Sequence, residues 1–190
     1  MKLRAIASLV IAVALASGAS AQSIGVFFDP AGASCATTQL PNTSGTMYIL
    51  AALGGASAGG LTGAEFRVDN FPSSWFANVT PNPAANLVLG NPLQGGCNIA
   101  FPTCQIGMTG IVTLYTVQYF ATDVQVNRRV SVLRHTTPSN ANFQCPLQTL
   151  CDAPMFSKLC VNGGQGVING AGCTVAVAQK SWSGVKSLYN

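Results

Sequence analysis

The chain has 190 residues, of which only 7% are charged, and its formal net charge is +4 at neutral pH. The sequence holds no basic run and no basic patch interleaved with aromatic residues, which argues against nucleic-acid binding. Gly, Ser, Thr, Asn and Ala are plentiful. A polar but uncharged surface of this kind is typical of a secreted wall or matrix protein.

The N-terminus, residues 1–21, has the pattern of a secretory signal peptide. Lys2 and Arg4 precede an apolar stretch, and small residues follow up to Ala21. The apolar stretch is shorter than the ~20 residues that span a bilayer, so we expect membrane contact only during export. Cleavage near Ala21 would leave one domain with seven Lys and Arg against five Asp and Glu, located extracellularly or in the periplasm.

Short segments rich in β-branched and aromatic residues, separated by turn signals, follow the signal peptide. These eleven segments lie at 24–28, 47–53, 61–69, 78–80, 86–89, 97–101, 111–121, 128–135, 158–161, 165–168 and 173–178, and we expect eight or nine strands from them. The strongest signal is 111–121 followed by 128–135, which predicts a central antiparallel strand pair. Residues 136–158 read as a loop. Together the pattern predicts an all-β, antiparallel two-sheet sandwich of the immunoglobulin or cohesin type over residues 22–178.

The last residues, 179–190, differ from the rest of the chain. Ser181 or Ser183 can cap a short helix, and Trp182 and Tyr189 lie seven residues apart on one face of it. A helix this short is marginal in water by itself. We therefore expect an amphipathic C-terminal helix that docks on its own domain, on a partner or on an export receptor.

Seven cysteines follow the signal peptide, and in an exported chain they predict disulfides. They are Cys35, Cys97, Cys104, Cys145, Cys151, Cys160 and Cys173. The best local pair is Cys97–Cys104, which would close a tight loop. Among the three cysteines within 145–160 we expect one pair, with the third reaching Cys35 or Cys173. One cysteine must remain free or pair between chains. A zinc site is not expected, because no CxxC pair is present and the chain has one histidine.

Residues for catalysis are scarce. A Ser–His–Asp hydrolase would have to use His135, which lies at a strand end, and no G-x-S-x-G motif is present. Glu65 and Asp69, four apart on one strand, would be ~13 Å apart, too far for a glycosidase pair. The acidic residues form no calcium-binding run, and calcium binding stays open. We expect no enzyme activity and no cofactor, and we assign no residue to a metal site.

The segment GAEFRVDNFPSSWF, followed by PNPAANLVLG and GGCNIAF, resembles cohesin-like and carbohydrate-binding-module-like sandwiches of extracellular bacterial proteins over about residues 45–135. The resemblance implies a strand ending near an acidic residue, then an irregular crossover and a Gly-rich strand. The mature chain is also similar to a group of uncharacterised secreted bacterial proteins that end in Trp-x-x-(Val/Ile)-Lys-x-Leu-Tyr, here Trp182 to Tyr189. Neither resemblance brings a functional residue to this chain.

Binding is the function that the sequence favours. Trp75 and Phe76 are expected in a loop between strands, where they could stack on a sugar ring or a partner, although Trp75 could instead cap the core. With Trp182 and Tyr189 they are the candidate binding residues. We expect a secreted, non-enzymatic module that binds a carbohydrate or a protein. The alternative is a self-assembling envelope or matrix subunit that associates through an unpaired cysteine or an open edge strand.

Overall fold

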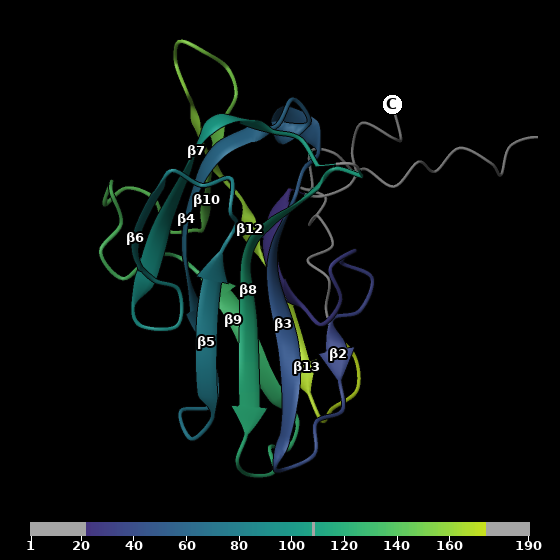
Figure 1. The fold of residues 1–190 in the computed structure, drawn as a ribbon. Coiled ribbons are helices and arrows are strands. Elements are labelled where there is room, and N and C mark those ends of the chain that lie inside the picture. The colour runs from purple at the N-terminus through teal and green to yellow at the C-terminus, as the bar shows by residue number, and fades with distance from the viewer. Residues whose placement is uncertain (1–21, 108, 174–190) are drawn as a thin grey trace, which may run out of the picture.

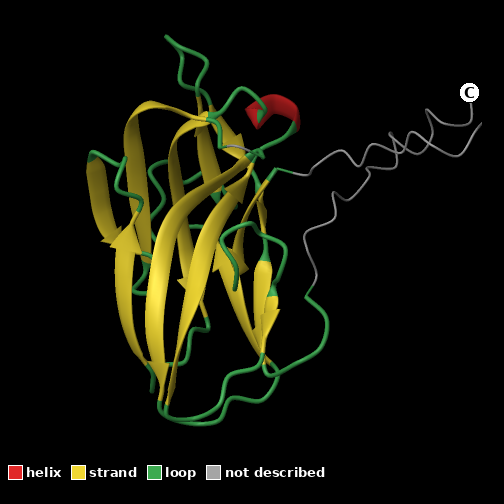
Figure 2. Cartoon of the chain, turned by 45° about the vertical axis from the view of Figure 1, so that its right-hand side comes forward, coloured by secondary structure: helices red, strands yellow, loops and turns green. Residues whose placement is uncertain are grey.

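The computed structural model describes residues 22–107 and 109–173, and these form two β-sheets that lie face to face (Figures 1 and 2). The expected signal peptide, the amphipathic tail and all but the first residue of the predicted strand 173–178 lie outside the described residues, so they stay predictions. Among the described residues no helix is long and apolar enough to cross a membrane.

The described strands number thirteen, with one turn of 3-10 helix, η1 (Gly55–Ser57). They are β1 (Ser23–Phe27), β2 (Ala36–Thr37), β3 (Thr43–Ala52), β4 (Leu61–Asp69), β5 (Phe76–Pro81), β6 (Leu87–Asn91), β7 (Gly96–Gln105), β8 (Ile111–Ala121), β9 (Arg128–Leu133), β10 (Leu147–Leu150), β11 (Lys158–Cys160), β12 (Asn162–Gly163) and β13 (Gln165–Ile168). The all-β prediction is confirmed. The count of thirteen exceeds the expected eight or nine: ten strands coincide with predicted segments, and the other three, β2, β10 and β12, are too short to show a clear periodic pattern.

The first sheet has the strand order β12-β1-β3-β8-β5, and its longest ladder joins β3 to β8. In the second sheet β4 pairs with β10 along its first half and with β9 along its second half, while β7 pairs with its other edge and β6 follows β7. Strands β11, β13 and β2 complete this sheet. Both sheets are mixed rather than purely antiparallel, because β1 pairs with β12 and β2 with β13 in parallel.

The core lies between the two sheets and follows from the alternation of apolar residues along the strands. Val130 and Val132 of β9, for example, are buried, while Arg129 before them and Leu133 after them are exposed. The first sheet contributes Ile24, Val26, Met47, Ile49, Leu114 and Val117, and the second contributes Leu61, Phe66, Val68, Ile99, Val130 and Val132. Each fully buried aliphatic or aromatic side chain of this type stabilises the fold by about 1.5–3 kcal/mol.

The predicted central pair of 111–121 with 128–135 is wrong as a pair. Both segments are strands, but β8 belongs to the first sheet and β9 to the second. The turn 122–127 therefore crosses from one sheet to the other, and it leaves Val124 and Val126 exposed. The predicted loop 136–158 also needs correction, since β10 lies within it and pairs with β4.

Three disulfides are present: Cys35–Cys173, Cys104–Cys151 and Cys145–Cys160. The predicted Cys97–Cys104 pair is wrong, because both residues lie on β7. The seven residue steps between them place their Cα atoms ~23 Å apart, beyond the reach of a disulfide. One pair within 145–160 is confirmed, but the third cysteine of that group bonds Cys104. Cys97 is the free cysteine, and it is buried.

Cys97 is expected not to react in the native protein. Burial raises the pKa of its thiol to about 12, so almost no thiolate is present at neutral pH, and no reagent reaches it. Maleimide treatment followed by mass spectrometry should leave the native chain unmodified and add one label after unfolding without reductant. Fast labelling of the native chain at Cys97, absent in Cys97→Ala, would contradict the structure.

Candidate binding site

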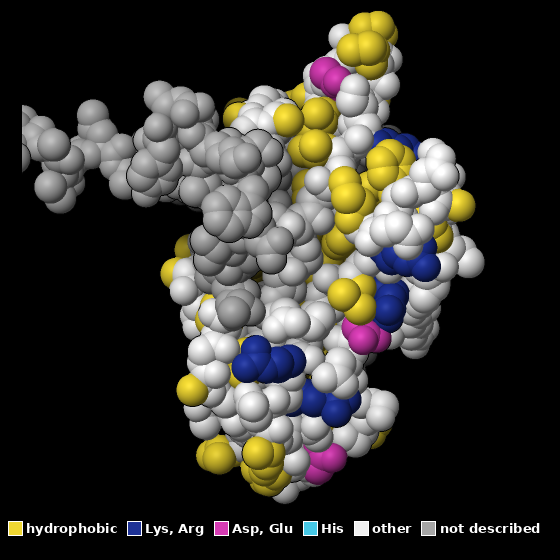
Figure 3. All heavy atoms as spheres, turned by 180° about the vertical axis from the view of Figure 1, so that it is seen from behind, with side chains coloured by type: hydrophobic (Ala, Val, Ile, Leu, Met, Phe, Trp, Pro, Cys, Tyr) yellow, Lys and Arg dark blue, Asp and Glu magenta, His cyan; other side chains and the backbone are white. Residues whose placement is uncertain are grey.

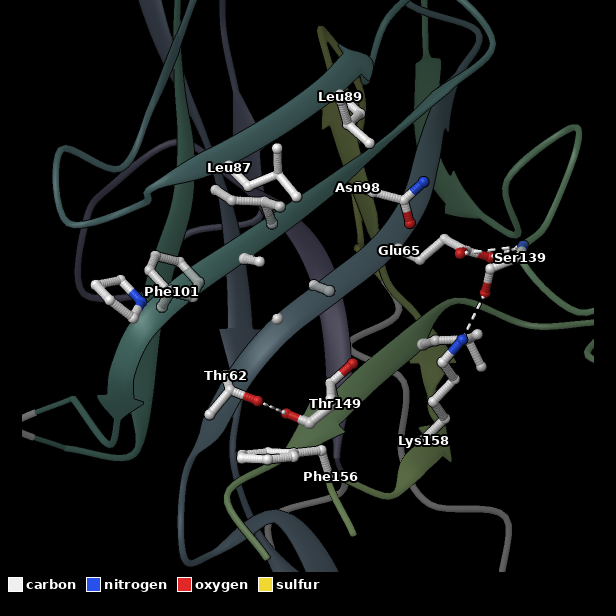
Figure 4. Close-up of a pocket in the computed structure, with 16 residues that line it drawn as sticks. Thr62, Glu65, Leu87, Leu89, Asn98, Phe101, Ser139, Thr149, Phe156 and Lys158 are labelled. Atoms are coloured by element: carbon white, nitrogen blue, oxygen red, sulfur yellow. Dashed lines mark hydrogen bonds between the residues drawn. The ribbon is translucent and has the colours of Figure 1, made fainter. Parts of the chain in front are cut away.

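A groove of about 580 Å3 crosses the outer face of the second sheet, over β4, β7 and β10 (Figure 4). The strand registers explain its shape. One row across the sheet runs Leu87, Ala100, Gly63, Thr149 and Lys158, from β6 through β7, β4 and β10 to β11. The residues at the centre of this row are small, whereas those at its two ends are long. The sheet surface is therefore hollow in the middle and raised at both sides.

The next row across the sheet runs Leu89, Asn98, Glu65 and Leu147. Glu65 is 6% exposed although it carries a carboxylate. Its two oxygens accept the backbone N–H of Ser139, at 3.0 and 3.2 Å, from the loop that follows β9. The Lys158 Nζ donates to the Ser139 hydroxyl at 2.8 Å, as Figure 4 shows. Through these hydrogen bonds Glu65 holds the loop at Ser139 against the sheet, and this loop forms one wall of the groove.

The Glu65 carboxylate is not saturated by these contacts. An ionised carboxylate has about four acceptor positions, and here a single N–H is shared between its two oxygens. Among the described residues the one ion pair joins Arg67 to Asp69. Glu65 therefore forms no ion pair with a Lys, Arg or His side chain of this part of the chain. The groove therefore combines an apolar surface with one buried acceptor that has capacity to spare.

The rim of the groove is apolar and exposed. Leu87 and Leu89 of β6 are 50% and 54% exposed, and Phe156 on the opposite side is 48% exposed. Phe156 lies in the loop 151–157, which is held at its base by the Cys104–Cys151 disulfide. Within that loop Asp152 accepts the Ser157 N–H at 2.7 Å. Figure 3, which views the second sheet from outside, shows hydrophobic side chains gathered on this face beside Lys and Arg side chains.

Trp75, one of the predicted binding residues, is buried. Its indole is 5% exposed, stacks on Tyr119 with ring centroids 5.1 Å apart, and meets Phe71 edge-on. The indole N–H donates to an Asp123 carboxylate oxygen at 2.7 Å. This burial corrects the expectation of an exposed platform that includes Trp75: the ring caps the core, which was the alternative prediction.

The other predicted binding residues have different outcomes. Phe76 is 72% exposed, but it opens β5 rather than lying in a loop. Trp182 and Tyr189 lie outside the described residues. His135 accepts the Thr137 N–H at its Nδ1, at 3.0 Å, in keeping with a hydrogen-bonded strand-end histidine. No group of three or more potential metal ligands occurs within residues 22–107 and 109–173.

Sequence reasoning missed the groove. The run Leu87–Val88–Leu89 could have indicated it. Successive side chains of a strand point to opposite faces, so three consecutive apolar residues place apolar side chains on both faces, and only one of these faces the core. The sequence drew attention to Glu65 only as a possible catalytic partner of Asp69, not as a residue of a binding groove. The burial of Glu65 depends on Ser139, which is 74 residues away and folds over it. Nothing local in the sequence indicates that contact.

Comparisons with known proteins identify the fold. No protein-family model and no curated protein matches the sequence. Among solved structures, the sixth cohesin of scaffoldin B from Acetivibrio cellulolyticus, in complex with a dockerin, matches with a TM-score of 0.50 and 10% identity, over 80% of this chain and 100% of the cohesin. The cohesin module of a family 33 glycoside hydrolase from Clostridium perfringens matches with 0.52 and 10%, over 79% and 98%. The chain therefore has a cohesin-like sandwich, as the sequence resemblance implied.

Removing the Glu65 carboxylate should free the loop at Ser139. In Glu65→Ala the Ser139 N–H loses its acceptor, which should lower the free energy of unfolding by about 1–3 kcal/mol. Hydrogen exchange at Ser139 should be faster than in the native chain. Glu65→Gln keeps an acceptor oxygen and should retain most of the protection. Equal exchange in the native chain and Glu65→Ala would show that Glu65 does not hold this loop.

Asp123 should make stability depend on pH. Hydrogen bonds from Gln125, Trp75 and Ser74 hold the pKa of its carboxyl below the ordinary value. A lowered folded-state pKa stabilises the fold above the unfolded pKa, about 3.9, and that contribution is lost as pH falls through the folded pKa. Urea unfolding should therefore show Asp123→Ala less stable than the native chain at pH ~7, with the difference shrinking towards pH ~2. A difference that does not change with pH would contradict this.

Proposed function

We propose that the chain is an exported, non-enzymatic module that binds a protein partner in the groove over β4, β7 and β10. The observation that carries the proposal is the exposure of Leu87, Leu89 and Phe156 around a hollow that contains the buried acceptor Glu65. Exposed apolar side chains gathered at one site mark interaction surfaces, and interface cores combine apolar area with a few polar groups.

The shape of the groove favours a protein over a small molecule. It is bordered by the edge strand β6 on one side and by the loop 151–157 on the other, so it is open along its length. A segment of a partner can lie along it, with apolar side chains against Leu87 and Phe156. A hydrogen-bond donor of the partner would then reach Glu65. The loop 151–157 is tied by a disulfide, so little conformational entropy is lost when the partner binds.

The comparisons and the cysteines support this proposal. One of the solved cohesins with a similar fold was crystallised with a dockerin, a protein partner. Three disulfides in 152 residues from Gln22 to Cys173 fit an oxidising compartment outside the cytoplasm, in agreement with the predicted signal peptide. The scarcity of catalytic residues in the sequence favours binding over catalysis.

Of the two features that could support self-assembly, an unpaired cysteine and an open edge strand, the second is supported. Cys97 is buried, so it is not placed to link chains. The outer edges of β5 and β6 have no strand neighbour among the described residues, and neither strand contains a charged residue. Uncharged edges of this kind are open to pairing with another chain. Leu87 and Leu89 of β6 also line the groove, where they face Phe156 and the acceptor Glu65, and we therefore prefer a partner-binding role.

Charged substitutions in the rim should weaken partner binding. Immobilised mature chain is exposed to the exported proteins of its source organism, and a captured protein is then purified and titrated. Leu87→Asp and Leu89→Asp should each weaken its binding at least about tenfold, since each puts an unpaired charge in an apolar contact. Val126→Asp is the matched control, because Val126 is an exposed valine in the turn 122–127.

Two results would contradict the proposed function. One is that no protein is retained above a blank column. The other is that a retained protein binds the native chain, Leu87→Asp and Val126→Asp equally well. Because the substituted side chains are half-exposed or exposed, melting temperatures of the variants should stay close to that of the native chain, and this measurement separates lost binding from lost folding.

A further inference from the structure

The outer face of the first sheet presents a regular array of side chains that the groove does not use. The registers of β5, β8 and β3 align it in three rows across the sheet. The rows are Phe76, Phe120 and Ser44; then Asn78, Gln118 and Thr46; then Thr80, Thr116 and Tyr48. In Figure 1 these three strands lie side by side at the front of the molecule. From strand spacing and rise, the array covers ~10 Å by ~14 Å.

None of these nine side chains is charged, in contrast to the opposite face of the molecule, which shows Lys and Arg side chains (Figure 3). Neither the amides of Asn78 and Gln118 nor the hydroxyls of the array hydrogen-bond to any other residue in the described part of the chain. The amides can donate and accept, so the middle row offers both kinds of hydrogen bond.

Two aromatic rings border these amides. Phe76 and Phe120 are 72% and 38% exposed, and they are direct cross-strand partners, which places their Cβ atoms about 4.5–5.5 Å apart. Two exposed phenylalanines side by side expose apolar area that folding alone would have buried. Together with Asn78, Gln118 and Thr46 they line a shallow hollow of about 610 Å3.

We propose that this face is a second binding site, which takes a neutral polysaccharide. The C–H face of a sugar ring packs on the rings of Phe76 and Phe120, while its hydroxyls exchange hydrogen bonds with Asn78 and Gln118. Uncharged side chains match a neutral polymer, whereas an acidic polymer would find no cation in the array. The array is longer than one sugar ring, so it fits a segment of chain. This site does not depend on the proposed function, since it lies on the opposite sheet.

The test is a titration of the mature chain with four neutral soluble polysaccharides: hydroxyethyl cellulose, arabinoxylan, galactomannan and starch. Alginate serves as the acidic comparison. We expect saturable binding to at least one neutral polymer and weaker binding to alginate. The double variant Phe76→Ala with Phe120→Ala should lower that affinity at least about tenfold. Asn78→Ala and Gln118→Ala should each lower it about threefold.

Two further variants make the result specific. Phe76→Leu with Phe120→Leu keeps apolar bulk but removes the flat rings, so it should also weaken binding and should fold as the native chain does. Leu87→Asp in the groove should leave polysaccharide affinity unchanged. If Leu87→Asp loses protein binding but keeps polysaccharide binding, the two sites are distinct.

Three outcomes would overturn the proposal: no saturable binding to any of the four neutral polymers, equal binding by the native chain and the double alanine variant, or tighter binding of alginate. Sedimentation of the native chain provides one more check. If the native chain is a dimer that the double alanine variant converts to a monomer, this face is an interface between copies, and the polysaccharide site is wrong.

Discussion

The second sheet depends on the sharing of β4. Its first half pairs with β10 and its second half with β9, while β7 pairs along its other edge. Three segments from distant parts of the chain therefore hold their positions through one strand. The inward side chains Ala64, Phe66 and Val68 belong to the core, and the outward ones, Gly63 and Glu65, form the floor of the groove. The same strand thus holds the sheet together and positions the site.

The two outer faces of the sandwich have different chemistry because their strands differ in composition. On β4, β7 and β10 the outward positions mix small residues with a buried acid, and the flanking β6 and the loop 151–157 raise apolar walls. On β3, β5 and β8 the nine outward side chains of the array are amides, hydroxyls and aromatic rings, and none of them is charged. Both arrangements follow from the alternation of side chains along a strand. Every second side chain is buried in the core, and only the side chains between them reach the outer face.

The fold class could be predicted from the sequence because alternation is local. Val130 and Val132 indicate a half-buried strand without knowledge of any partner. The pairing of strands is not a local property. The six-residue turn 122–127 is short enough to predict a hairpin, yet β8 and β9 lie in different sheets. The disulfides show the same limit, since Cys97 and Cys104 are near neighbours in sequence and nearly a strand length apart in space. Trp75 could not be assigned from its neighbours either, because its burial depends on Tyr119 and Asp123, more than 40 residues later.

The pairing of the two ends of the described chain has a consequence for biogenesis. β1 lies beside β12, β2 lies beside β13, and Cys35 is bonded to Cys173, 138 residues away. In the proposed export the chain would emerge from its N-terminus onward, so β1 and β2 would appear first and meet their last partners only when almost the whole domain has crossed. The first sheet can begin to assemble from β1, β3 and β8, but its edge stays open until then. Contacts of such long separation slow folding, which gives extracytoplasmic chaperones and oxidases a defined interval in which to act.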